Sequence, residues 1–199
     1  MFLEDFDILV TVNDGHDPYH ALKRWLMGPY DHVAMYLGPM YLRAQAVREQ
    51  TPTLFPAVFE SIKRGVIIRD LRSWGPNKRV VVMRIPVLRL AEIEAGLAQK
   101  AVDLASESGS VYDYPAIFRW AIPRIILEKL NVEDCRRWRN DKRHLCSEAV
   151  YNLVEPFYDI LPDTMIPLPG DYVENGYLYN ICEGYLVVQP RTLVPWVSF

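Results

Sequence analysis

Short apolar runs separated by turn residues make up most of the first half of the chain. Residues 7–12 read DILVTV and end at Asn13-Asp14-Gly15, which predicts a strand followed by a turn. Similar runs cover residues 33–37, 57–60, 66–68 and 80–85. Their length and spacing predict a small antiparallel sheet or barrel.

Helical periodicity appears once early in the chain and then dominates its second half. Residues 18–26 have apolar side chains at helical spacing, and the same pattern returns over residues 88–106, 115–130 and 146–156. A chain of mainly strands followed by mainly helices is typical of the α+β class. The last part is rich in Pro and Tyr, and we expect it to be irregular apart from a closing strand near residues 185–188.

Neither an internal repeat nor a Gly/Ser-rich linker divides the sequence, so we expect one domain over residues 1–199. The 199 residues are 50% hydrophobic and 24% charged, as in a soluble globular chain that can bury a full core. The net charge of -3 argues against a general nucleic-acid binder. No apolar stretch approaches the roughly 20 residues of a membrane span. Because the first residues are acidic where a secretory leader is basic, we expect a cytoplasmic protein.

The three cysteines differ in their surroundings. Cys135, Cys146 and Cys182 form no C-x-x-C pair, so neither a disulfide framework nor a zinc ribbon is predicted. Cys146 stands at a predicted helix start, where the partial positive charge favours a thiolate and free N–H groups can bind an oxyanion. Cys135 and Cys182 are predicted to be core residues.

A nucleophilic cysteine needs a base and a group that orients the base. His32, at the start of a predicted strand, is a candidate base, and Glu60, on a neighbouring strand, is a candidate orienting carboxylate. Taken singly, a cysteine in a helix, a histidine before a strand and a glutamate on a strand are most often structural residues. The triad is therefore a hypothesis at this point.

Five segments carry a family resemblance. They are, in chain order, residues 7–9 with 30–38 (DIL and YDHVAMYLG), 59–66 (FESIKRGV), 111–114 (VYDY), 146–150 (CSEAV) and 169–172 (PGDY). Together they resemble the motifs of circularly permuted papain-like proteins of the NlpC/P60 superfamily, in the YiiX/YebB-like group. The order His32, Glu60, Cys146 matches the permuted arrangement, because unpermuted papain-like enzymes have the cysteine first.

The resemblance implies a small β-sheet or barrel packed against a helical part that carries the nucleophile helix. It also implies a thiol hydrolase without a cofactor, which cleaves an amide bond of a peptide, an amino-acid amide or an N-acyl compound through a thioester. Tyr30 and Ser147 are candidates for binding the substrate or the oxyanion. Two alternatives stay open: an acyltransferase acting on lipid acyl groups with the same triad, and a non-catalytic papain-like module of a larger assembly.

Two features depart from the family pattern. The connection from Gly38 to Glu60 is long, with residues 39–56 resembling an inserted helix or flap, so Glu49 or Asp70 could orient the base instead of Glu60. Asp31 stands where the family has Ser, and a carboxylate beside the base could raise the pKa of His32.

Two further groups of residues invite other chemistry. A basic stretch precedes the candidate nucleophile and contains Arg136, Arg137, Arg139, Lys142 and Arg143. It could favour the thiolate and hold an anionic part of a substrate, or be a solvated loop. His16 and His20 could join Cys146 or His144 at a metal, but no fourth ligand has a convincing spacing, so no metal site is predicted.

Overall fold

The computed structural model describes residues 3–42, 53–74, 78–85, 91–107, 111–113, 115, 117–131, 143–161 and 166–185. Its centre is an antiparallel sheet of six strands in the order β4-β3-β2-β1-β5-β8. The strands are β1 (Ile8–Val12), β2 (Tyr30–Leu42), β3 (Thr53–Ile62), β4 (Gly65–Asp70), β5 (Arg79–Arg84) and β8 (Tyr179–Tyr185). The predicted α+β class and antiparallel sheet are confirmed.

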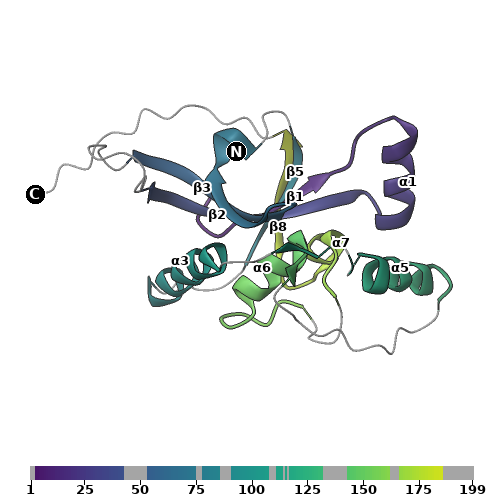
Figure 1. Ribbon diagram of the computed structural model, residues 1–199. Coiled ribbons are helices and arrows are strands. Elements are labelled where there is room, and N and C mark those ends of the chain that lie inside the picture. Colours follow the sequence, from purple (N-terminus) through teal and green to yellow (C-terminus); the bar gives the residue numbers. More distant parts are fainter. Residues whose placement is uncertain are drawn as a thin grey trace, which may run out of the picture.

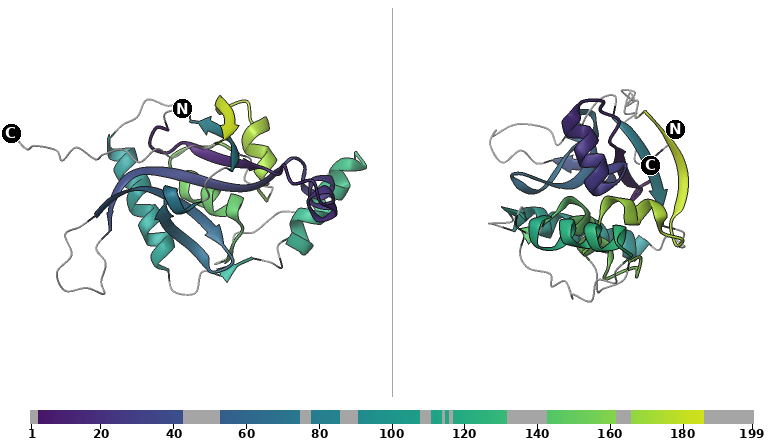
Figure 2. Two further views of the ribbon diagram at one scale, coloured as in Figure 1. Left: turned by 90° about the horizontal axis from the view of Figure 1, so that it is seen from above. Right: turned by 90° about the vertical axis from the view of Figure 1, so that its right-hand side faces the viewer.

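The helices are α1 (Pro18–Met27), α2 (Leu71–Trp74), α3 (Ala91–Ser106), the π-helix η1 (Ile117–Ala121), α5 (Ile122–Lys129), α6 (Cys146–Val154) and α7 (Pro169–Glu174). The right-hand view of Figure 2 shows the green helices as a layer beneath the curled sheet, whereas α1, in purple, stands beside the sheet (Figures 1 and 2). A short parallel pair joins β6 (Val111–Tyr112) to β7 (Arg143–His144). None of the helices within the described ranges is both long and apolar enough to cross a membrane.

Alternation along the strands produces two separate cores. Ile8, Val10 and Val33 belong to the large cluster beneath the sheet, whereas their neighbours Leu9 and Ala34 belong to a smaller cluster on the other face. The smaller cluster is closed by Leu71 and Trp74 of α2. Because both faces are covered, the central strand β1 reads as a continuous apolar run from Ile8 to Val10.

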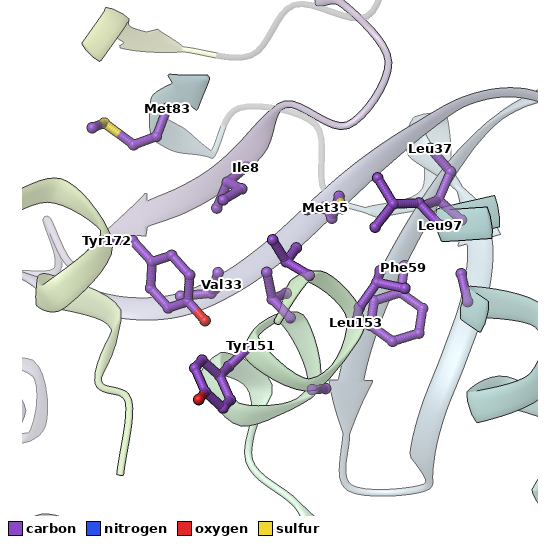
Figure 3. Close-up of a cluster of buried hydrophobic side chains, with 14 of the residues drawn as sticks. Ile8, Val33, Met35, Leu37, Phe59, Met83, Leu97, Tyr151, Leu153 and Tyr172 are labelled. Carbon is purple, nitrogen blue, oxygen red and sulfur yellow. The ribbon is translucent and has the colours of Figure 1, made fainter. Parts of the chain in front are cut away.

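Helix α6 fills the space beneath the sheet, and all nine of its residues are buried. Figure 3 shows Leu153 of α6 in one cluster with Ile8, Val33 and Met35 of the strands, and with Tyr172 of α7 at its edge. The Tyr172 hydroxyl also donates to the carbonyl oxygen of Ser147 at 2.6 Å, which joins α7 to the first turn of α6. The start of α6 is thus held by a hydrogen bond from α7 as well as by packing against the sheet.

Some elements differ from the predicted ones. Strand β2 continues past Gly38, where the backbone takes a positive φ of 83° and the register with β3 shifts, so the glycine bends the strand instead of ending it. The helix expected over residues 115–130 is not uniform: the π-helix η1 runs directly into α5, and Pro123, which cannot donate a backbone hydrogen bond, stands at the start of α5. The closing strand, β8, begins at Tyr179, earlier than expected.

Truncating the centre of α6 should destabilise the whole fold. Leu153 is fully buried between the helix and the sheet, so Leu153→Ala is expected to lower the free energy of unfolding by about 2–5 kcal/mol. Val102→Ala, at a position 37% exposed on α3, is the control and should change it by no more than about 0.5 kcal/mol. Urea denaturation measures both. A loss at Leu153 no larger than at Val102 would contradict the described packing of α6.

Candidate active site

The first residue of α6 is Cys146, and its side chain is buried. The residue is only 5% exposed. The helix start is fixed by Glu148, whose carboxylate accepts the backbone N–H of Leu145 at 3.1 Å. The backbone N–H groups of Val33 and Ser147 act on this sulfur and lower the pKa of the thiol. Donors from a strand and from the helix therefore converge on one atom.

The His32 ring lies between this sulfur and a buried carboxylate. Its Nε2 atom is 2.6 Å from Oε2 of Glu60. Because a carboxylate only accepts hydrogen bonds, Nε2 must carry the proton in this contact. Nδ1 is then the ring nitrogen left to interact with Cys146, the residue whose charge raises the pKa of His32 most.

Strand register explains why His32 meets Glu60. Strands β2 and β3 pair with Met35 opposite Phe59, so the same register continued by one residue sets Ala34 opposite Glu60. His32 is two residues beyond Ala34 and therefore projects to the same face, diagonal to Glu60, within reach of a long side chain.

Glu60 is buried completely and is held by three other side chains. Besides His32, the indole N–H of Trp74 donates to Oε2 at 2.8 Å. Nε of Arg69 lies 2.5 Å from Oε1, as an ion pair whose N–H is not aligned for a hydrogen bond. Burial alone would raise the pKa of Glu60, but His32, Trp74 and Arg69 together lower it. The carboxylate is thus kept ionised in a buried place.

The same contacts shift the pKa values of the base and the thiol in opposite directions. Burial lowers the pKa of His32, but the charges and hydrogen bonds of Cys146 and Glu60 outweigh it and raise the pKa to about 9. Burial raises the pKa of the Cys146 thiol, but His32 and the N–H groups of Val33 and Ser147 outweigh it and lower the pKa. These shifts favour a thiolate beside an imidazolium at neutral pH.

Asp70 does not reach the base. It pairs with Ala57 across the hairpin, at the level of Gly38 on β2, and its carboxylate binds Arg72, with Nε to Oδ2 at 2.8 Å. Glu49 lies outside the described residues, as does the part of the 39–56 segment from 43 to 52. Among the residues described, Glu60 is the carboxylate in contact with His32.

The two residues expected to assist the substrate or oxyanion are placed differently. The Ser147 hydroxyl is buried and donates to the carbonyl oxygen of Pro167 at 2.6 Å, while its backbone N–H faces the Cys146 sulfur. Tyr30 begins β2, and its pKa is raised by burial and by the carboxylates of Glu183 and Glu174. A substrate role for either residue stays a prediction.

Other residues that the sequence singled out do not contact Cys146. The Asp31 carboxylate accepts hydrogen bonds from the Thr11 hydroxyl at 2.5 Å and from Lys23 at 3.0 Å. It is therefore bound to these two residues and not to the neighbouring His32 ring. The His20 ring pairs with Asp17 at 2.5 Å. No group of three or more His, Cys, Asp or Glu side chains suited to a metal occurs in the described part of the chain.

The remaining predictions concern the other cysteines and the basic stretch. Cys182 is half-buried on β8, packed against the smaller core, and burial raises the pKa of its thiol. Cys135 and residues 136–142 lie outside the described residues, and for Arg143 only the backbone is described.

Two residues that complete the site were not predicted. Arg69 could have been found from alternation, because Glu60 pairs with Ile67 and Arg69 is two residues further along the same face of β4. Trp74 carries no such signal, because its contact with Glu60 depends on how α2 folds back over the sheet.

The fold resembles a known structure. It matches the crystal structure described as metalloprotein yiiX from Escherichia coli O157:H7, DUF1105, with a TM-score of 0.55 and 16% identity. The match covers 92% of this chain and 98% of that one. No family model matches the chain, and no curated protein matches it. The predicted link to YiiX is supported at the level of fold, while membership of the NlpC/P60 superfamily stays a prediction.

Alkylation of Cys146 should depend on His32 in a characteristic way. In the wild type the thiol pKa is lowered and His32 stays protonated until the pH passes about 9, so we expect labelling of Cys146 at neutral pH. In His32→Ala, burial still raises the pKa of the Cys146 thiol, but the positive charge of His32 that lowered it is gone. We therefore expect reactivity only at alkaline pH. Iodoacetamide labelling, followed by peptide mass mapping of Cys146, measures both profiles, with Cys182 as an internal control. Identical profiles in the two proteins would contradict the ion pair.

Proposed function

We propose that this chain is a thiol hydrolase that cleaves an amide bond through Cys146, His32 and Glu60. The supporting observation is that one imidazole contacts a buried carboxylate at 2.6 Å and that its pKa is raised by the thiol of Cys146, which stands at the first turn of a helix. That arrangement supplies a nucleophile, a base and an orienting group. The YiiX-like fold and the chain order His32, Glu60, Cys146 support the narrower proposal of a permuted papain-like enzyme of the NlpC/P60 superfamily.

The proposed acylation begins from the thiolate and the imidazolium. The sulfur of Cys146 bonds to the substrate carbonyl carbon, and the negative charge moves to the carbonyl oxygen. Backbone N–H groups at the start of α6 stabilise this oxyanion. The carbon–nitrogen bond then breaks as His32 gives its proton to the leaving amine, and a thioester remains on Cys146.

Deacylation returns the enzyme to its starting state. His32, now neutral, takes a proton from a water molecule that bonds to the thioester carbon. The carbon–sulfur bond breaks, which releases the carboxylic acid and the thiolate. Glu60 holds the ring in the same tautomer throughout, because its carboxylate accepts the Nε2 proton.

The cavity next to His32 favours a polar substrate over a lipid acyl chain. A cavity of about 540 Å³ adjoins His32 and Glu60, and most of its lining side chains are charged or polar. An acyltransferase for lipids needs an apolar channel for the chain. The lowered thiol pKa, in turn, favours an enzyme over a module without catalysis.

Metal chemistry fits the described residues poorly. The matching structure is described as a metalloprotein, but the described part of this chain holds no group of three or more suitable ligands. At the candidate site, the His32 nitrogen that faces Glu60 carries a proton, which excludes it as a ligand while that contact persists. The proposed steps therefore use the side chains alone.

A covalent intermediate tests this proposal directly. Intact-mass measurements with a panel of peptide, amino-acid amide and N-acyl lipid substrates should detect an acyl group on Cys146, with release of the amine. Cys146→Ser should form no thioester and release no amine. Amine release that continues undiminished in Cys146→Ser would contradict the proposal.

Removing the charge of Glu60 should slow the reaction more than it weakens binding. Glu60→Gln can no longer hold the protonated ring, so kcat is expected to fall by about 10²- to 10⁴-fold. Glu92→Gln, at an exposed position on α3, is the matched control and should leave kcat unchanged. Steady-state kinetics on a substrate from the panel measures both. Equal kcat values for the two variants would remove Glu60 from the mechanism.

A further inference from the structure

The cavity beside His32 carries an excess of positive charge. Its basic lining residues are Lys23, Lys63, Arg69, Lys78 and Arg79, and its acidic ones are Asp14, Asp31 and Glu60. They come from segments far apart in the sequence: α1 and the turn before it, β2, the β3–β4 hairpin, and β5 with the residue before it. The fold thus gathers more cations than anions around one wall of the candidate site.

Three of these cations are already neutralised. Lys23 pairs with Asp31 at 3.0 Å, Arg69 with Glu60 at 2.5 Å, and Arg79 with Glu183 at 2.5 Å. Lys63 and Lys78 have no acidic partner among the residues that the structure describes. Lys63 is exposed to water at the hairpin turn, whereas Lys78 is half-buried. Among the basic residues of this cavity, Lys78 is therefore the one whose charge a bound anion would stabilise most.

Several contacts locate the Lys78 ammonium close to the reacting groups. Its Nζ lies 4.5 Å from the centre of the Trp74 ring, and the indole N–H of that ring donates to Glu60. Burial lowers the pKa of Lys78, and the charges that act on it belong to Glu60, Arg69, Asp31 and Lys23, all of which line the cavity. A partly desolvated ammonium is thus held one side chain away from the carboxylate that orients His32.

We infer that this cavity binds an anionic group of the substrate, a carboxylate or a phosphate, with Lys78 as its main contact. The inference rests on the proposed function in that it calls the ligand a substrate. The binding site itself depends only on the cavity and its charges. Lys63, at the rim of the cavity, adds a long-range attraction that salt screens.

Two alkylating reagents of different charge test the inference. Iodoacetate is an anion and iodoacetamide is neutral, and both react with the same thiolate. Their rate ratio at Cys146 therefore cancels any change in the pKa of the thiol. We expect the ratio to exceed that of N-acetylcysteine by on the order of tenfold at low salt, because the cavity concentrates the anion beside His32.

The variants separate Lys78 from general charge. Lys78→Met should reduce the ratio several-fold towards the N-acetylcysteine value, and Lys78→Arg should restore it. Lys100→Met removes the same charge from α3, outside the cavity lining, and should leave the ratio as in the wild type. Equal ratios in Lys78→Met and Lys100→Met would overturn the inference.

Equilibrium binding tests the same site without thiol chemistry and distinguishes the two anions. Calorimetry on Cys146→Ser should detect binding of N-acetylglycine or inorganic phosphate, but not of the neutral N-methylamide of N-acetylglycine. The stronger of the two signals identifies the anion, and either should be lost in the Cys146→Ser, Lys78→Met double variant. Binding in this assay with no thioester in the wild type would refute the proposed function alone. Absence of binding to both anions would refute the anion site alone.

Discussion

The buried carboxylate of Glu60 is the constraint on which the site depends. An ionised carboxylate without contact to water is costly unless other groups compensate it. Here the compensating groups are His32, Trp74 and Arg69, from β2, α2 and β4. Each contact that stabilises the charge also fixes a piece of the site, so the ring of His32 is held in one tautomer and directed at Cys146.

The candidate site also requires that the thiol of Cys146 be held in a fixed position beneath the sheet. Helix α6 is buried along its whole length, and its first turn is held by Glu148 on one side and Tyr172 on the other. The position of the sulfur is thereby fixed by the packing of α6 in the large cluster beneath the sheet. The candidate site joins the two halves of the fold, because His32 and Glu60 come from the sheet and Cys146 comes from the helical layer (Figure 1).

The sequence allowed the α+β class, the early strands and the start of α6 to be predicted, because each has a clear apolar period. It also singled out Cys146, His32 and Glu60, which the structure brings together. What could not be read from the chain is tertiary: the bend at Gly38, the position of Trp74 over Glu60, and the gathering of Lys23 and Lys78 at one cavity. These depend on contacts between residues that are far apart in the sequence.

The direct test of this account is the charge on Cys146 in the resting protein. The ultraviolet absorbance of a thiolate, taken as the difference between the wild type and Cys146→Ser, can be followed through a pH titration. The account predicts that the thiolate absorbance is present at neutral pH and disappears only on acidification, since His32 stays protonated up to about pH 9. Absorbance that appears only above about pH 8.5, the usual pKa of a free cysteine, would contradict it.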